Sequence, residues 1–171
     1  MRPFKISGIK ERFNFDGALK DLFQRGLPSV IGLLTGGVRV RSFLNVELRQ
    51  LNEKRVDLIL LLEDGSILHI EIQSVNDPRM KFRMGVYYYL VKETYAEVPV
   101  RQVVLYVGEP AMNMAAGMEA DGNALAYELI DIRQFDAESM MATGNPADLA
   151  LALLAGDGKA RLEEIVRCAA S

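Results

Sequence analysis

The clearest alternation of hydrophobic and polar residues lies in the middle of the chain. Hydrophobic residues alternate strictly with His69, Glu71 and Gln73, and this period of two predicts a strand over residues 67–73. Side chains two positions apart in a strand leave the same face. Glu71 and Gln73 are therefore expected on one wall, with a hydrophobic layer behind them.

Four other segments have the pattern of strands. Continuous hydrophobic runs are typical of strands buried on both faces, and a run that follows a predicted helix is typical of the middle of a sheet. The predicted strands cover residues 38–48, where the alternation is partial, 56–62, which has the pattern of a buried strand, 103–107, where the hydrophobic run is continuous, and 125–132. The stretch 108–123 is rich in Gly and Met without a sustained period, which predicts a loop or an irregular hairpin.

Helical spacing of hydrophobic residues predicts the helices. The first helix starts near residue 15, with Asn14 or Asp16 as its N-cap, and ends at Gly26. A second long helix opens with Asp77 as N-cap and Pro78 at the first helical position, and continues to about residue 95. Shorter helices are predicted over residues 30–34, 137–141, 147–154 and 159–168.

A change in pattern after residue 133 divides the chain into two parts. Residues 1–133 contain every predicted strand and form the expected core domain. Residues 134–171 contain only short helices and form a C-terminal helical annex, either complete or cut short in its last helix. The chain is thus expected to be an α/β protein with one main domain.

The loop between the second and third predicted strands decides whether Asp57 joins Glu71. A two-residue turn would place Asp57 opposite Ile72, on the wrong face. A three-residue loop over residues 63–65, with Gly65 in the left-handed conformation, would place Asp57 directly opposite Glu71. Two facing carboxylates at that spacing suit one hard divalent cation. The sequence permits both registers.

Composition limits the class of protein. The chain has 20 Lys and Arg against 23 Asp and Glu, for a net charge of -3, which argues against a protein that coats nucleic acid with a strongly basic face. The single cysteine, Cys168, cannot form an internal disulfide, and the first residues do not resemble a secretory signal. No hydrophobic run approaches the roughly 20 residues that cross a bilayer. A soluble, cytoplasmic protein is expected, with no membrane contact.

Three motifs together carry a resemblance to a known family. They are the run Arg55-Val-Asp57-Leu-Ile-Leu, the turn Glu63-Asp-Gly65 and the strand His69-Ile-Glu71-Ile-Gln73-Ser74. In this order and spacing they resemble the core of the Rpn family, recombination-promoting nucleases also described as transposase-like. Residues 16–23 and 79–89 are similar to the helices before and after that core, so the resemblance covers about residues 14–155.

The resemblance implies a fold and an activity. The family belongs to the PD-(D/E)xK nuclease superfamily, which implies a restriction-endonuclease-like mixed sheet flanked by helices. It also implies an endonuclease that hydrolyses phosphodiester bonds in DNA with Mg²⁺ (or Mn²⁺), with a link to recombination or mobile elements. Carried over by position, Asp57 and Glu71 would be the metal ligands, and Gln73 would be the third catalytic residue.

Gln73 departs from the superfamily, which usually carries a lysine there. A glutamine can hydrogen-bond the attacking water but brings no positive charge, so catalysis is expected to be slow or to draw a cation from elsewhere. Arg79, Arg83 and Lys20 are the candidates for that cation and for phosphate contact. Asp16 is a candidate additional acid, although a role as N-cap or as the ion-pair partner of Lys20 is favoured.

Several alternatives stay open. Asp57 could simply start an edge strand, and Glu71 with Gln73 could form an ordinary solvated strand face. His69 is more often a hydrogen-bonded structural residue than a ligand, and Glu47 is more readily a surface residue than a further ligand. The three tyrosines at 87–89 cannot share one helix face, so some of them are expected in the core. The main rival to a nuclease is a non-catalytic module of the same fold that binds nucleic acid or assembles with protein. A third reading is a structural domain whose acidic wall binds metal only for stability. A homodimer is kept as an expected assembly.

Overall fold

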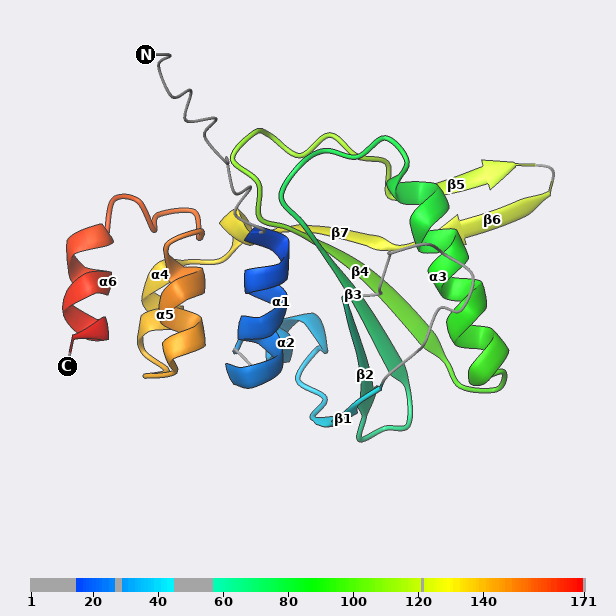
Figure 1. Ribbon diagram of the computed structural model, residues 1–171, viewed down its shortest axis with the longest axis horizontal. Helices are drawn as coiled ribbons and strands as arrows, with labels where there is room; N and C mark the ends of the chain where they lie inside the picture. Colours follow the sequence, from blue (N-terminus) through cyan, green and yellow to red (C-terminus); the bar gives the residue numbers. More distant parts are fainter. Residues whose placement is uncertain (1–14, 27–28, 45–56, 121, 171) are drawn as a thin grey trace, which may run out of the picture.

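A five-stranded mixed sheet forms the centre of the protein (Figure 1). The computed structural model describes residues 15–26, 29–44, 57–120 and 122–170. The strand order is β1-β2-β3-β4-β7, where β1 pairs antiparallel with β2 and β2 antiparallel with β3, whereas β3 to β4 and β4 to β7 are parallel. The strands are β1 (Val40–Phe43), β2 (Leu58–Leu62), β3 (Ile67–Gln73), β4 (Val100–Tyr106) and β7 (Glu128–Asp131). A mixed α/β fold is confirmed, and β4 lies in the interior of the sheet as predicted.

Helices cover both faces of this sheet. Among the described helices, α3 (Met80–Thr94) lies on one face, and the others lie on the opposite face or beyond its edge (Figure 1). The other helices are α1 (Phe15–Gly26), α2 (Val30–Leu34), α4 (Ala137–Met141), α5 (Pro146–Ala152) and α6 (Leu162–Ala169), with a 3₁₀ turn η1 (Ile132–Gln134) before α4. No described helix has both the length and the apolar character that crossing a bilayer requires.

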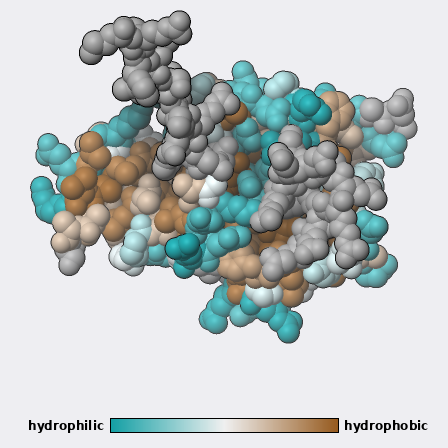
Figure 2. Space-filling model, viewed as in Figure 1, coloured by the Kyte–Doolittle hydropathy of each residue, from teal (hydrophilic) through white to brown (hydrophobic). Residues whose placement is uncertain are grey.

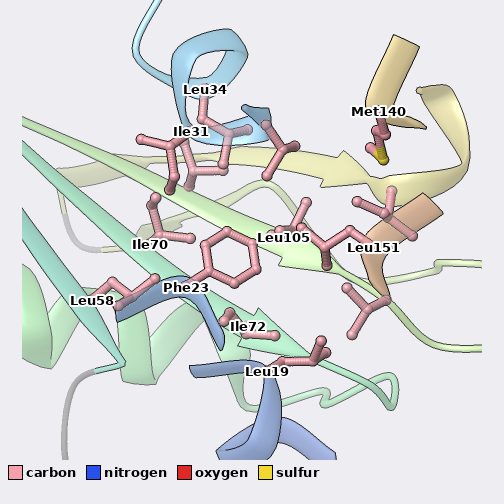
Figure 3. Close-up of a cluster of buried hydrophobic side chains, with 14 of the residues drawn as sticks. Leu19, Phe23, Ile31, Leu34, Leu58, Ile70, Ile72, Leu105, Met140 and Leu151 are labelled. Atoms are coloured by element: carbon pink, nitrogen blue, oxygen red, sulfur yellow. The ribbon is translucent and has the colours of Figure 1, made fainter. Parts of the chain in front are cut away.

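The main hydrophobic core lies between the sheet and α1. Phe23 of α1 is fully buried and lies among Ile70, Ile72 and Leu105 (Figure 3). Side chains alternate between the two faces of a strand. In β2 and β3, every second residue therefore faces α1, and the residues between them face α3. Ile59, for example, packs in a second cluster with residues of α3. The sheet is thus buried on both faces along β3.

The C-terminal helices share the main core. Met140 and Leu151 belong to the same hydrophobic cluster as the residues of α1. The α1 and α5 helices approach closely at Gly26, where a Cβ atom would collide with the side chain of Ala147. Asn145 Nδ2 also donates a hydrogen bond to the Gly26 carbonyl at 2.8 Å. The boundary between residues 133 and 134 stays a prediction, and the core continues across it.

The β2–β3 hairpin has the three-residue loop. Gly65 has a φ of 83°, the left-handed conformation, and the Leu62 N–H donates to the Ser66 carbonyl at 2.9 Å. The register that follows pairs Leu58 with Ile70. This confirms the second of the two registers considered for the sequence, because glycine has no Cβ to oppose a positive φ.

The predicted start of α3 was wrong by two residues. Asp77 and Pro78 form a turn before the helix, in which Asp77 Oδ1 accepts a hydrogen bond from the Arg79 N–H at 2.8 Å. The Met80 N–H bonds to the Asp77 carbonyl at 3.0 Å, and the regular helix begins at Met80. Asp77 thus makes the side-chain bond predicted for it, to the N–H two residues on, but through a turn and not through the first turn of the α-helix.

The predicted strand over residues 125–132 is extended as expected but is not one strand, because the chain changes sheet within it. Its first residues belong to β6 (Asn123–Ala126), which pairs with β5 (Gly117–Ala120) in a separate hairpin. Tyr127 then turns inward and donates its hydroxyl to the Ala115 carbonyl, and β7 follows. The hairpin option for residues 108–123 is confirmed. Elsewhere α5 ends two residues earlier than predicted, at Ala152, and α6 begins three residues later than predicted, at Leu162. Residues 45–48 of the first predicted strand lie outside the described part.

Candidate active site

Three polar side chains of β3 lie beneath α3. His69, Glu71 and Gln73 leave the face of the sheet that α3 covers, and all three are buried, with Glu71 only 1 % exposed. This excludes the solvated strand face considered for the sequence. A buried polar row needs partners, since an unpaired carboxylate or amide in such a place is costly.

Asp57 lies next to Glu71, directly before β2. The Asp57 N–H is 3.5 Å from Glu71 Oε2, and Asp57 Oδ2 accepts a hydrogen bond from the Ile72 N–H at 2.9 Å. The carboxylate of Asp57 therefore takes the place of a strand carbonyl where the regular β2–β3 pairing ends. The hairpin brings the two predicted metal ligands together, as the three-residue loop requires.

The surroundings of Asp57 disfavour its negative charge. Burial, and after it the nearby Glu71 carboxylate, raise the pKa of Asp57 to about 7. The hydrogen bond from Ile72 and the cations Lys20 and Arg83 oppose this rise. A carboxyl group with a raised pKa gains most from a cation that would compensate its charge.

Arg83 is the cation that lies deepest in the cluster. Its guanidinium binds the Glu71 carboxylate, and its Nη1 donates to Asp77 Oδ2 and to Gln73 Oε1, each at 3.2 Å. Burial would lower the pKa of Arg83, but the Glu71 carboxylate and the Asp77 hydrogen bond outweigh it and raise that pKa. Arg83, one of the three cations considered for the sequence, thus places a positive charge beside Gln73, which has none.

The other sequence candidates lie in different places. Lys20 Nζ, from α1, is 4.0 Å from Asp57 Oδ1, so a second cation reaches the carboxylate pair from the opposite layer. Arg79 is exposed directly before α3, and its side chain has no described contact with the cluster, which does not support it as the replacement cation. Asp16 belongs to α1, but its side chain lies outside the described residues, as does Glu47.

Gln73 has partners within the protein for both ends of its amide. Its Nε2 donates to the Val75 carbonyl at 2.8 Å, and its Oε1 accepts from Arg83. An amide has two N–H groups and two lone pairs on oxygen, so one donor and one acceptor site of Gln73 are left for a water molecule.

Two residues of the cluster were missed at the level of sequence. Asp77, interpreted there as a helix cap, is an ion-pair partner of Arg83. Gln102 of β4 places its Nε2 2.9 Å from His69 Nδ1 and donates to the Met84 carbonyl at 3.0 Å. The signal for Gln102 was a lone amide at the edge of a hydrophobic strand. With Nδ1 as acceptor, His69 carries its proton on Nε2, which lies 3.5 Å from Glu71 Oε2. His69 is therefore a structural residue that is hydrogen-bonded through Nδ1, and its buried Nε2 lies beside Glu71 without a hydrogen-bond partner among the described residues.

The donor set fits one kind of metal site. Across the described ranges, no group of three or more His, Cys, Asp or Glu side chains is arranged to hold an ion. Asp57 and Glu71 give two carboxylates, and Mg²⁺ is commonly held by one or two carboxylates, with water and substrate phosphate completing its shell. The pair fits such an open site and not a closed cage made of protein ligands. A bound ion would share Glu71 with Arg83.

Comparisons with known proteins add no relative. No family model, no curated protein and no solved structure matches this chain. Membership of the Rpn family and the restriction-endonuclease-like form of the mixed sheet therefore stay predictions, which rest on the motifs around Asp57, Glu71 and Gln73.

Proposed function

We propose that this chain is a metal-dependent endonuclease that hydrolyses phosphodiester bonds in DNA. One observation carries the proposal: Asp57 and Glu71 meet across the β2–β3 hairpin, and Asp57 is held in surroundings that disfavour its charge. Groups with strongly shifted pKa values gather at functional sites more often than elsewhere. A link to recombination or mobile elements rests on the family resemblance alone.

Each residue of the cluster has a role in this proposal. Asp57 and Glu71 would hold a magnesium ion, which when bound polarises a phosphoryl oxygen and lowers the pKa of a water molecule. Gln73 orients the attacking water through its remaining hydrogen-bonding positions. Arg83 offsets charge on the phosphate, because its guanidinium can donate to phosphate oxygens as it does to Glu71. His69 Nε2, 3.5 Å from Glu71 Oε2, would donate to that carboxylate and hold it in place.

One observation favours the rival function, a non-catalytic module. Arg83 already neutralises Glu71 and occupies Gln73 Oε1, so the cluster is largely satisfied by its own contacts. In such a module the same contacts would serve only to hold α3 against β3.

Nicking of supercoiled plasmid DNA separates the two functions. We expect the parent protein to nick plasmid with Mg²⁺ and not with EDTA, and Glu71→Gln to slow nicking by more than the about 10–100-fold that loss of a supporting contact costs. Glu63→Gln is the matched control, because Glu63 is an exposed carboxylate in the same hairpin; it should nick like the parent.

Metal binding supplies a readout that does not depend on catalysis. Titration calorimetry with Mn²⁺ should show one site per chain, lost in Glu71→Gln and kept in Glu63→Gln. Binding without nicking would support the structural metal site, and neither binding nor nicking would leave the non-catalytic module as the function.

A further inference from the structure

The α3 helix is hydrophobic on two opposite faces. One face is buried against the sheet by Met80, Met84, Tyr87 and Val91. The opposite face exposes large hydrophobic side chains, namely Phe82 (54 % exposed), Val86 (42 %) and Tyr89 (66 %). A helix that packs on one sheet is normally polar on its outer face, and a helix that is hydrophobic all round is normally buried all round. The outer face of α3 is thus built to be covered.

The exposed positions follow the spacing of a helix–helix seam. They are Arg79, which directly precedes the helix, and Phe82, Val86, Tyr89 and Glu93. These positions are separated by three, four, three and four residues, which is the a/d spacing of helices that pack along their length. The other residues of α3 are buried or half-buried, apart from Thr94 at its end. We call these five residues the α3 seam.

The charges at the two ends of the α3 seam indicate which kind of partner would cover it. Arg79 is at one end, Glu93 is at the other, and Val86 is midway between them. Neither Arg79 nor Glu93 has an ion-pair partner among the residues that the structure describes. A second α3 that runs antiparallel about a twofold axis at Val86 would place each Arg79 beside the partner's Glu93, whereas a parallel copy would oppose like charges.

Each aromatic ring of the seam contacts the side chain of its neighbour in the sequence. Lys81 Nζ lies 5.2 Å from the centre of the Phe82 ring, and the Tyr88 and Tyr89 rings make an edge-to-face contact at 5.7 Å. Side chains that are already ordered lose less entropy on association. A nucleic acid fits this surface less well, because the seam carries one positive and one negative residue instead of a basic patch.

We propose that the α3 seam is a homodimer interface, in which α3 packs antiparallel against α3 of a second copy of this chain. Arg83 and Glu71 lie on the inner side of α3, so this contact leaves both candidate active sites intact. The inference therefore stands apart from the nuclease proposal. A single pair of four-turn helices is a small interface, which predicts a weak, concentration-dependent dimer.

Light scattering after gel filtration and sedimentation velocity test the dimer. We expect the mass of the parent to rise with concentration from that of one chain, 19.0 kDa, toward twice that value. Val86→Glu should raise the dissociation constant by about tenfold or more, because it places two like charges at the centre of the seam. Val166→Glu is the matched control, since Val166 is 57 % exposed on α6, at the end of the molecule where hydrophobic surface also gathers (Figure 2). It should dimerise like the parent, and equal melting temperatures would show that both variants fold.

Charge reversal tests the antiparallel arrangement itself. Arg79→Glu and Glu93→Arg should each weaken the dimer by a few-fold, because each brings like charges together. Mixing the two variants in equal amounts should restore dimers of parental strength, since every Glu would then face an Arg. A parent that stays monomeric, a dimer that Val166→Glu disrupts and Val86→Glu does not, or a mixture no stronger than its components would overturn the proposal. Monomers that bind single-stranded DNA through Phe82 and Tyr89 would overturn it in favour of a nucleic-acid surface.

Discussion

The guanidinium of Arg83 binds the carboxylate of Glu71 beneath α3, and this ion pair joins the helix to the strand at the candidate active site. Glu71 is buried, and Arg83 is the cation that makes its charge tolerable without metal. The same contact has two consequences that can be measured, one for stability and one for catalysis.

Removal of Arg83 should leave a buried charge without compensation. We expect Arg83→Met to lower the free energy of unfolding by about 3–5 kcal/mol, the usual cost of losing one partner of a buried ion pair. Lys159→Met removes an ion pair that is almost fully exposed and should cost at most about 1 kcal/mol. Urea unfolding with EDTA measures both values.

A double variant separates the charge from the packing of Arg83. Arg83→Met with Glu71→Gln removes both charges, so it should recover most of the stability that Arg83→Met alone loses. Equal losses for Arg83→Met and Lys159→Met would mean that Glu71 is not held as a buried anion.

The raised pKa of Asp57 predicts how stability depends on pH. Its pKa rises from an ordinary 3.8 to about 7 in the folded protein, so between these values the folded state binds more protons than the unfolded state. The contribution of Asp57 to stability is therefore highest below pH 4 and falls as pH rises to 7, by at most a few kcal/mol. Asp57→Asn should flatten this dependence and be at least as stable as the parent at pH 8 without metal. Urea unfolding from pH 4 to 8, with EDTA, gives both curves, and a parental curve that matches Asp57→Asn would contradict the prediction.

If the nuclease proposal holds, substitution of Gln73 separates metal binding from the cleavage of DNA. Gln73→Ala should slow nicking of plasmid DNA while Mn²⁺ affinity stays nearly unchanged, because both metal ligands remain. Gln73→Lys would place an ammonium group beside the Arg83 guanidinium, which bonds to Gln73 in the parent. We expect the lysine to support activity only together with Arg83→Met, where it replaces the lost charge. Equal rates in all these variants would remove Gln73 from the catalytic residues.

The hairpin loop gives a test of backbone conformation alone. An added Cβ meets no atom at Gly65 or at Gly32, but Gly65 has a φ of 83° and Gly32 lies in α2. Gly65→Ala should therefore cost about 1–2 kcal/mol, whereas Gly32→Ala should be neutral or stabilise by up to about 1 kcal/mol. Gly65→Asn should recover part of the loss, because asparagine tolerates the left-handed region. Thermal unfolding ranks the three variants, and equal values for the two alanine variants would contradict a strained loop.

The sequence by itself determined the two strands of the hairpin, because both lie within one short segment on either side of a turn. The alternation around Glu71 also determined which side chains share its face. These features depend on neighbours in the chain, so the pattern was sufficient to predict them. The sequence left two registers open, and the left-handed Gly65 in the structure decided that Asp57 faces Glu71.

Only the tertiary structure decided what surrounds these carboxylates. Because α3 is hydrophobic on both faces, its pattern could not show whether Arg83 or Phe82 points toward the sheet. The contact between His69 and Gln102 depends on the parallel register of β3 and β4, two strands joined through a helix. Burial of Glu71 and the raised pKa of Asp57 follow from that packing, since desolvation is set by groups far away in the chain and near in space.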